Sequence, residues 1–238
     1  MISATGVSVH YLFDRQQRTM SPATARLRRK GGETWALSDV TFEMRDGEGV
    51  ALLGASGSGK STLLRVIAGV LEPDKGILRT AGRVGSLLSV QAGVMALLTG
   101  RENTLLLGVL AGMTPRQARA EMEEVKRRSG LGEHYERLVA SYSQGMRARL
   151  GLAVIERTHP TILLLDEIHE ALDHEFRDHV HGYAHDLLAA GGVVVATGHD
   201  HPMLERLCTR ALLLQGGHLV ADGDFTEIQR VYLGDRRA

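Results

Sequence analysis

The stretch "GVALLGASGSGKSTLLRVIAG" at residues 49–69 constrains the fold of this chain more than any other. An apolar run at 50–53 predicts a buried strand, and the apolar spacing after residue 60 predicts a helix. The glycine-rich loop between them, at 54–59, begins the pattern G-x-x-x-x-G-K-S. In this context the loop is expected to wrap its backbone N–H groups around phosphate oxygens, because glycine permits the tight backbone and a helix N-terminus favours anions. The same context disfavours the alternative, a glycine-rich turn that binds nothing.

The three residues that follow the loop have individual expected roles toward ATP. Lys60 would reach the β and γ phosphates, Ser61 would ligate Mg²⁺, and Thr62 would hold the α phosphate. The predicted phosphate-binding residues are therefore Gly54, Ala55, Ser56, Gly57, Ser58, Gly59, Lys60, Ser61 and Thr62.

A second phosphate-site element is expected in "TILLLDE", an apolar strand that ends in two carboxylates. Asp166 would hold the metal, and Glu167 would polarise the attacking water as the catalytic base, with Lys60 assisting at the phosphates. A strand ending in Asp-Glu is common at α/β sheet edges, but together with the loop it indicates an ATPase. The later strand "GGVVVATGHD" leads to His199, which is predicted either to contact the γ phosphate or to be structural.

Composition limits the classes of partner. Lys plus Arg and Asp plus Glu are 28 each, so no bulk electric field favours a nucleic acid, and no nucleic-acid partner is expected. One cysteine, Cys208, is expected to be a small buried apolar residue in a reducing compartment. No apolar run approaches the about 20 residues of a membrane span, and the first residues do not resemble a signal peptide.

The segment "SYSQGMRARLGLAV" at 141–154 reads by itself as a helix start with Ser143 as N-cap. Placed shortly before the Asp-Glu strand, it resembles the signature loop of the nucleotide-binding subunits of ABC transporters. "YSQGM" keeps the serine and glycine of that loop and changes the rest. The resemblance implies that this turn caps ATP held by a second copy of the chain, through Ser143, Gln144, Gly145 and Met146.

The resemblance implies further site residues. Tyr11 lies where the family stacks an aromatic side chain on adenine, although it is also a candidate core residue. Asp173, in "EALDHEF", corresponds to a carboxylate at the dimer seam. The family's metal-sensing glutamine corresponds to Gln91 or to position Ser89. Gln91 is favoured because a carboxamide both accepts from and donates to metal-bound waters.

The fold that the resemblance implies is a single α/β domain over 1–238, an ABC ATPase of the P-loop NTPase class. It has a mostly parallel sheet, an antiparallel β subdomain and a helical lobe inserted at about 92–155. Within that lobe, Thr114 and Gln117 form a predicted capping box, with Pro115 at the first helical position. The expected partners are a second copy in a head-to-tail ATP dimer and a separate membrane permease, which places the chain at the cytoplasmic face of the membrane.

Several segments resemble one branch of the family, the subunits that export O-antigen, teichoic acid or other lipid-linked glycans. These are "GRVGSLL", "LTGREN", "YSQGM" and "DEIHEALDHEF". No C-terminal glycan-binding domain is expected, because the sequence ends soon after "GHLVADGDFTEIQRVYL". The alternatives are the ATPase of an ABC importer or drug exporter, and a soluble ABC-type ATPase that acts on nucleic acid or ribosomes. The last class usually carries long coiled-coil inserts or two fused domains.

Two features are not assigned by the resemblance. The insertion at 14–33 contains six Arg or Lys residues, and it is either a solvated loop or a contact with the membrane face. Asp178, His181 and His185 lie at helical spacing and are a candidate zinc-type site, set against the simpler interpretation of a polar exposed helix.

Overall fold

The computed structural model describes residues 1–12, 33–87, 94–166, 174–198 and 200–235. Its centre is a six-stranded sheet in the order β5-β6-β7-β3-β8-β9. The first five of these strands run parallel, and the last pairs antiparallel with its neighbour. Their bounds are β5 Val84–Leu87, β6 Ile162–Asp166, β7 Val193–Thr197, β3 Gly49–Leu53, β8 Arg210–Gln215 and β9 His218–Asp224.

The central parallel strands β3, β6 and β7 are apolar on both faces because both faces are covered. Alternate residues of β3 enter two different cores: Val50 and Leu52 face one, whereas Ala51 and Leu53 face the other. This two-residue alternation explains why the strand is read in the sequence as a continuous apolar run rather than as an alternating one.

One face of the sheet packs against α1 (Lys60–Ile67) and a three-stranded antiparallel sheet. That smaller sheet has the order β2-β1-β4, with bounds Glu33–Met44, Ile2–Leu12 and Lys75–Thr80. Leu63 and Leu64 of the helix share a buried cluster with Leu37 and Val40 of β2. The antiparallel subdomain is thereby joined to the helix that follows the glycine-rich loop.

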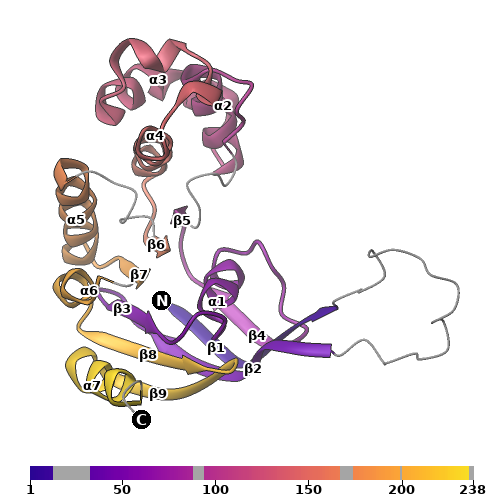
Figure 1. Ribbon diagram of the computed structural model, residues 1–238. Coiled ribbons are helices and arrows are strands. Elements are labelled where there is room, and N and C mark those ends of the chain that lie inside the picture. Colours follow the sequence, from indigo (N-terminus) through magenta and orange to yellow (C-terminus); the bar gives the residue numbers. More distant parts are fainter. Residues whose placement is uncertain (13–32, 88–93, 167–173, 199, 236–238) are drawn as a thin grey trace, which may run out of the picture.

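The opposite face is covered by α5 (His174–Ala189), α6 (His201–Leu207) and α7 (Phe225–Asp235), which lie along one side in Figure 1. Cys208 belongs to this core, and burial raises the pKa of its thiol to about 12. The prediction that this cysteine is a small buried residue is confirmed.

A group of helices lies apart from both sheets, at the top of Figure 1. It consists of α2 (Gly100–Leu110), α3 (Pro115–Ser129) and α4 (Gln144–Arg157), with the short 3-10 turns η2 (Gly132–Glu136) and η3 (Val139–Ser141). These elements, called the helical lobe below, have their own buried cluster around Tyr135 and Leu150. Thr114 and Gln117 form the predicted capping box of α3, with Pro115 at its start. Among the helices described, none combines the length and hydropathy required of a membrane-spanning segment.

Candidate nucleotide-binding site

The glycine-rich loop connects the buried strand β3 to α1, and glycine is needed at its different positions for different structural reasons. Gly54, Gly57 and Gly59 all have positive φ, at 145°, 79° and 111°. A Cβ on Gly59 would lie 2.6 Å from the carbonyl oxygen of Ala36 and 2.8 Å from Leu37 Cδ2, both on β2. A Cβ on Gly57 would have nothing within 4 Å. One glycine therefore lets the loop touch the antiparallel sheet, and another borders open space.

Lys60, the first residue of α1, places a positive charge across this loop. Its side chain is largely buried, and Nζ donates to the carbonyl oxygens of Gly54 at 2.7 Å and Ala55 at 3.1 Å. The helix has Gly59 as its N-cap, without a side-chain cap. The loop thus combines a lysine ammonium with a helix start that no side chain caps, an arrangement suited to an anion.

Ser58 ties the loop to the rest of the sheet and also offers a hydroxyl. Its carbonyl oxygen accepts from Gly217 N at 3.0 Å, in the turn between β8 and β9. The side chain is buried, and its Oγ has no hydrogen-bond partner among the described residues. A buried hydroxyl of this kind is expected to be satisfied by a group bound at the loop.

Asp166 lies at the same edge of the sheet as the loop. In the parallel register, Leu165 of β6 lies beside Ala196 of β7, which lies beside Ala51 of β3. Asp166, half-buried, follows at the next position and pairs with Thr197. The carboxyl ends of parallel strands are where open α/β sheets bind their ligands, and Asp166 and the loop both lie at that edge.

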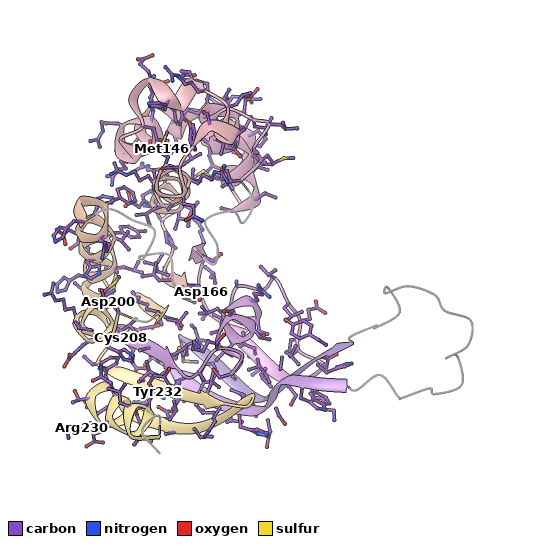
Figure 2. All side chains as sticks on the ribbon, viewed as in Figure 1. Met146, Asp166, Asp200, Cys208, Arg230 and Tyr232 are labelled. Atoms are coloured by element: carbon purple, nitrogen blue, oxygen red, sulfur yellow. The ribbon has the colours of Figure 1, made fainter. Side chains whose placement is uncertain are left out.

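The signature turn at the start of α4 lies elsewhere. Ser143 is exposed, and its Oγ accepts from Met146 N at 3.1 Å, which confirms the predicted N-cap. Gln144 is also exposed, and Gly145 is half-buried. In Figure 2, Met146 lies within the helical lobe, whereas Asp166 lies near the sheet. The structure does not bring the signature turn to the sheet edge of its own chain.

Tyr11 lies in the sheet that borders the loop. It is half-buried on β1 and pairs with Thr34 of β2, two positions before the Ala36 that approaches Gly59. Both predictions for Tyr11, adenine stacking and core packing, stay open.

Several predicted site residues lie outside the described residues. They are Glu167, Asp173, His199, Gln91 with its alternative Ser89, and most of the basic insertion at 14–33. The zinc hypothesis gains no support in the part of the chain that the structure describes. No group of three or more His, Cys, Asp or Glu side chains there is placed to hold a metal. Burial also lowers the pKa of His181, with Arg206 adding to the effect.

Asn103 is a buried polar residue whose role the sequence reasoning missed. It lies in the first turns of α2 with no exposed surface. Its carboxamide accepts from Met95 N at 2.8 Å and donates to the carbonyl oxygens of Met95 at 3.0 Å, Leu98 at 3.3 Å and Thr99 at 2.9 Å. These bonds fasten the segment at 95–99 to α2. The detectable signal is a lone carboxamide that opens the apolar run "NTLLLGVL".

Comparisons with known proteins agree with this geometry. A family model described as "ABC transporter" matches residues 37–170, which is more than half of the chain. The O-antigen export system ATP-binding protein RfbB of Klebsiella pneumoniae is 36% identical, over 85% of this chain and 82% of the relative. The teichoic acids export ATP-binding protein TagH of Listeria innocua is 33% identical, over 83% of this chain and 59% of the relative.

Solved structures support the fold. A bacterial ABC transporter cassette, solved as a dimer, is 22% identical and superposes with a TM-score of 0.76, over 94% of this chain and 99% of that one. The expected fold class, α/β with a mostly parallel sheet, an antiparallel sheet and helices, is confirmed. The family match and the relatives that cover most of the chain establish that this protein belongs to the ABC transporter family.

Proposed function

We propose that this chain is the ATP-hydrolysing subunit of an exporter that moves a lipid-linked polysaccharide, or a related cell-envelope glycan, across the cytoplasmic membrane. The observation that carries the proposal is the loop between β3 and α1. Three glycines of positive φ, a lysine folded across the loop and a buried serine hydroxyl form a cradle for phosphate groups. ATP is the substrate that the family binds.

Each described residue of the cradle has a role in the proposal. Lys60 neutralises the β and γ phosphates, and its two carbonyl contacts keep the ammonium at the loop before nucleotide arrives. Thr62 and the backbone N–H groups at 55–61 hold the phosphates nearer the sugar. Tyr11 stacks on the adenine ring. Glu167, as general base, and His199, at the γ phosphate, complete the catalytic set.

The residues present also fit Mg²⁺. Ser61 is exposed in the first turn of α1, and Asp166 is half-buried at the end of β6, so a hydroxyl and a carboxylate are available at the same edge of the sheet. Hydroxyl and carboxylate oxygens are the ligands that Mg²⁺ prefers. Bound there, with Gln91 as the proposed metal-sensing residue, the ion would neutralise charge that develops on the phosphates.

A second copy of the chain completes each site in this proposal. Ser143 and Gly145 stand at an exposed helix start, away from the sheet edge of their own chain. In a head-to-tail dimer they would cap ATP held by the partner's loop, with Asp173 at the seam between the copies. ATP binding then favours the closed dimer, and hydrolysis releases it.

The class of cargo rests on the relatives, which are named for O-antigen and teichoic acid export. By analogy, a separate permease would span the membrane, and this chain would sit at its cytoplasmic face. If the chain instead served an importer or a drug exporter, inactivating it in its source cell would leave the surface glycan unchanged. If it acted on nucleic acid or ribosomes, no membrane protein would co-purify with it.

Glu167→Gln tests the chemistry. The amide cannot accept a proton from water, so turnover should fall about 10²-fold or more while ATP affinity is kept. Steady-state hydrolysis and nucleotide-binding titration measure the two quantities. In the source cell, the same variant should leave lipid-linked glycan on the cytoplasmic side of the membrane and reduce the amount at the cell surface. Near-normal turnover would reject Glu167 as the base, and near-normal surface glycan would reject the cargo.

A further inference from the structure

The carboxylate of Glu156, on the helix α4 that begins at the signature turn (the signature helix), is buried between two other helices. Glu156, near the end of α4, has only 2% of its side chain exposed. One of its oxygens, Oε2, accepts from Arg128 Nη1 of α3 at 2.9 Å. The other, Oε1, lies 2.6 Å from His179 Nε2 of α5. Each oxygen therefore has a partner on a different helix, and the three side chains form one connected group.

The two partners are held by further contacts. Arg128 also donates through Nε to Glu124 at 2.7 Å, which fixes the direction of its guanidinium group. The ring of His179 lies 5.3 Å from that of Phe176, one turn earlier on α5. Phe176 in turn lies 5.0 Å from the guanidinium of Arg149 on α4. Two side-chain links thus run between α4 and α5.

The position of α4 gives these links a consequence. Leu150 and Val154 belong to the core of the helical lobe, whereas Ala148 and Leu152 belong to the core that covers the sheet. The helix begins at the signature turn, and α5 begins at residue 174, directly after the segment 167–173 that contains Glu167 and Asp173. A fixed pairing of α4 with α5 would hold the signature turn in one spatial relation to the start of α5, the helix that follows the catalytic segment in the sequence.

We infer that Glu156 is a positioning residue for ATP hydrolysis, because its contact with His179 aligns the signature helix with the helix that follows the catalytic segment. The inference rests on the proposed function and adds to it a residue that touches neither nucleotide nor metal. The contact requires a proton on His179 Nε2, since a carboxylate oxygen only accepts. A side chain at 179 that offers an N–H at the same reach should therefore preserve the alignment.

The chain provides a matched control. Glu121 of α3 lies 2.6 Å from Arg157 Nε of α4, so this pair also joins the two lobe helices. Within the described part of the chain, the hydrogen bond and ion pair of Glu121 run to α4 and not to α5. Glu121→Gln and Glu156→Gln both neutralise one carboxylate between α3 and α4, but only the second also removes the charge that contacts α5 through His179. A difference between the two variants thus reports the link to α5 rather than the integrity of the lobe.

The test measures ATP hydrolysis by the purified full chain, with the kcat and KM of each variant and its melting temperature. Glu156→Gln and His179→Ala should each lower kcat about tenfold and leave KM for ATP within about twofold, because the phosphate loop is untouched. His179→Gln, which retains a donor at the contact, should restore kcat to within about twofold of wild type. Glu121→Gln should behave like wild type.

Equal kcat values for Glu156→Gln and Glu121→Gln would overturn the inference, and so would His179→Gln as impaired as His179→Ala. His179 is partly exposed, so His179→Ala keeps the test decisive if Glu156→Gln does not fold. These outcomes differ from failure of the proposed function. A wild-type chain that hydrolyses no ATP would reject the function and this inference with it, whereas an active wild type with an equally active Glu156→Gln rejects the inference alone.

Discussion

At the scale of single residues, two glycines of the phosphate loop are required for different structural reasons. Gly57 and Gly59 both have positive φ, which costs a side-chain-bearing residue about 1–2 kcal/mol. Only Gly59 also faces a backbone carbonyl, that of Ala36, at a distance that no Cβ tolerates. The conformation requires glycine at both positions, and packing against Ala36 adds a second requirement at Gly59 that the sequence pattern does not reveal.

Gly59→Ala and Gly57→Ala separate these constraints. Gly59→Ala should lower the free energy of unfolding by about 2–3 kcal/mol, because β2 or the loop must move, whereas Gly57→Ala should cost about 1 kcal/mol. ATP affinity should fall more for Gly59→Ala, since Gly59 directly precedes Lys60 and a shift there also displaces the lysine. Urea unfolding measures the loss of stability, and nucleotide titration measures the loss of ATP affinity. If the two variants lose equal stability, the contact with Ala36 does not constrain the loop.

At the scale of elements, the helical lobe depends on buried polar anchors as well as on its apolar core. The carboxamide of Asn103 makes four hydrogen bonds to the segment before α2. That segment follows residues 88–93, where the metal-sensing glutamine is predicted, and it pairs through Leu98 O with Val139 N, shortly before the signature turn. One buried side chain thus supports a connection between two predicted functional segments.

Asn103→Ala should lower the free energy of unfolding by about 2–4 kcal/mol, because the hydrogen bonds of the buried carboxamide to the segment at 95–99 are lost and Met95 N–H loses its acceptor. Glu102→Gln is the matched control one residue away. The side chain of Glu102 is exposed and completes the capping box with Thr99, a role that glutamine also fills. Glu102→Gln should therefore lower the free energy of unfolding by only about 0.3 kcal/mol. Chemical denaturation compares them, and equal stability of the two variants would show that Asn103 anchors nothing.

Local elements were predictable because short-range chemistry determines them. The strand, loop and helix at 49–68 follow from apolar spacing and glycines, and the starts of α3 and α4 follow from Thr114 and Ser143. The order of strands in the sheet was not predictable in this way, because it depends on contacts between distant segments. Glu156 was missed because "VIERTHP" reads as an ordinary polar helix end. The available signal was its place on the stripe of Ala148 and Leu152, at intervals of four residues.

At the scale of the whole molecule, the proposed function divides each ATP site between two elements of the chain that lie apart. The phosphate loop and Asp166 share one edge of the central sheet, and the signature turn lies in the helical lobe (Figure 2). A carboxylate introduced at the signature turn should therefore harm the ATP site of a second copy, while the loop of the same chain still binds nucleotide. This distinction between copies allows a test by mixing two defective chains.

The test uses a Glu167→Gln background, in which bound ATP should keep the dimer closed. Gly145→Asp places negative charge against the partner's γ phosphate, and Lys60→Ala weakens nucleotide binding, so each variant alone should remain monomeric with ATP. In the mixed dimer, one site combines both defects and the other combines an intact loop with an intact turn. ATP-dependent pairing should reappear in the mixture, seen as co-elution of differently tagged chains on size exclusion. The composite site is contradicted if Gly145→Asp alone dimerises normally, because the turn would then be only a helix start.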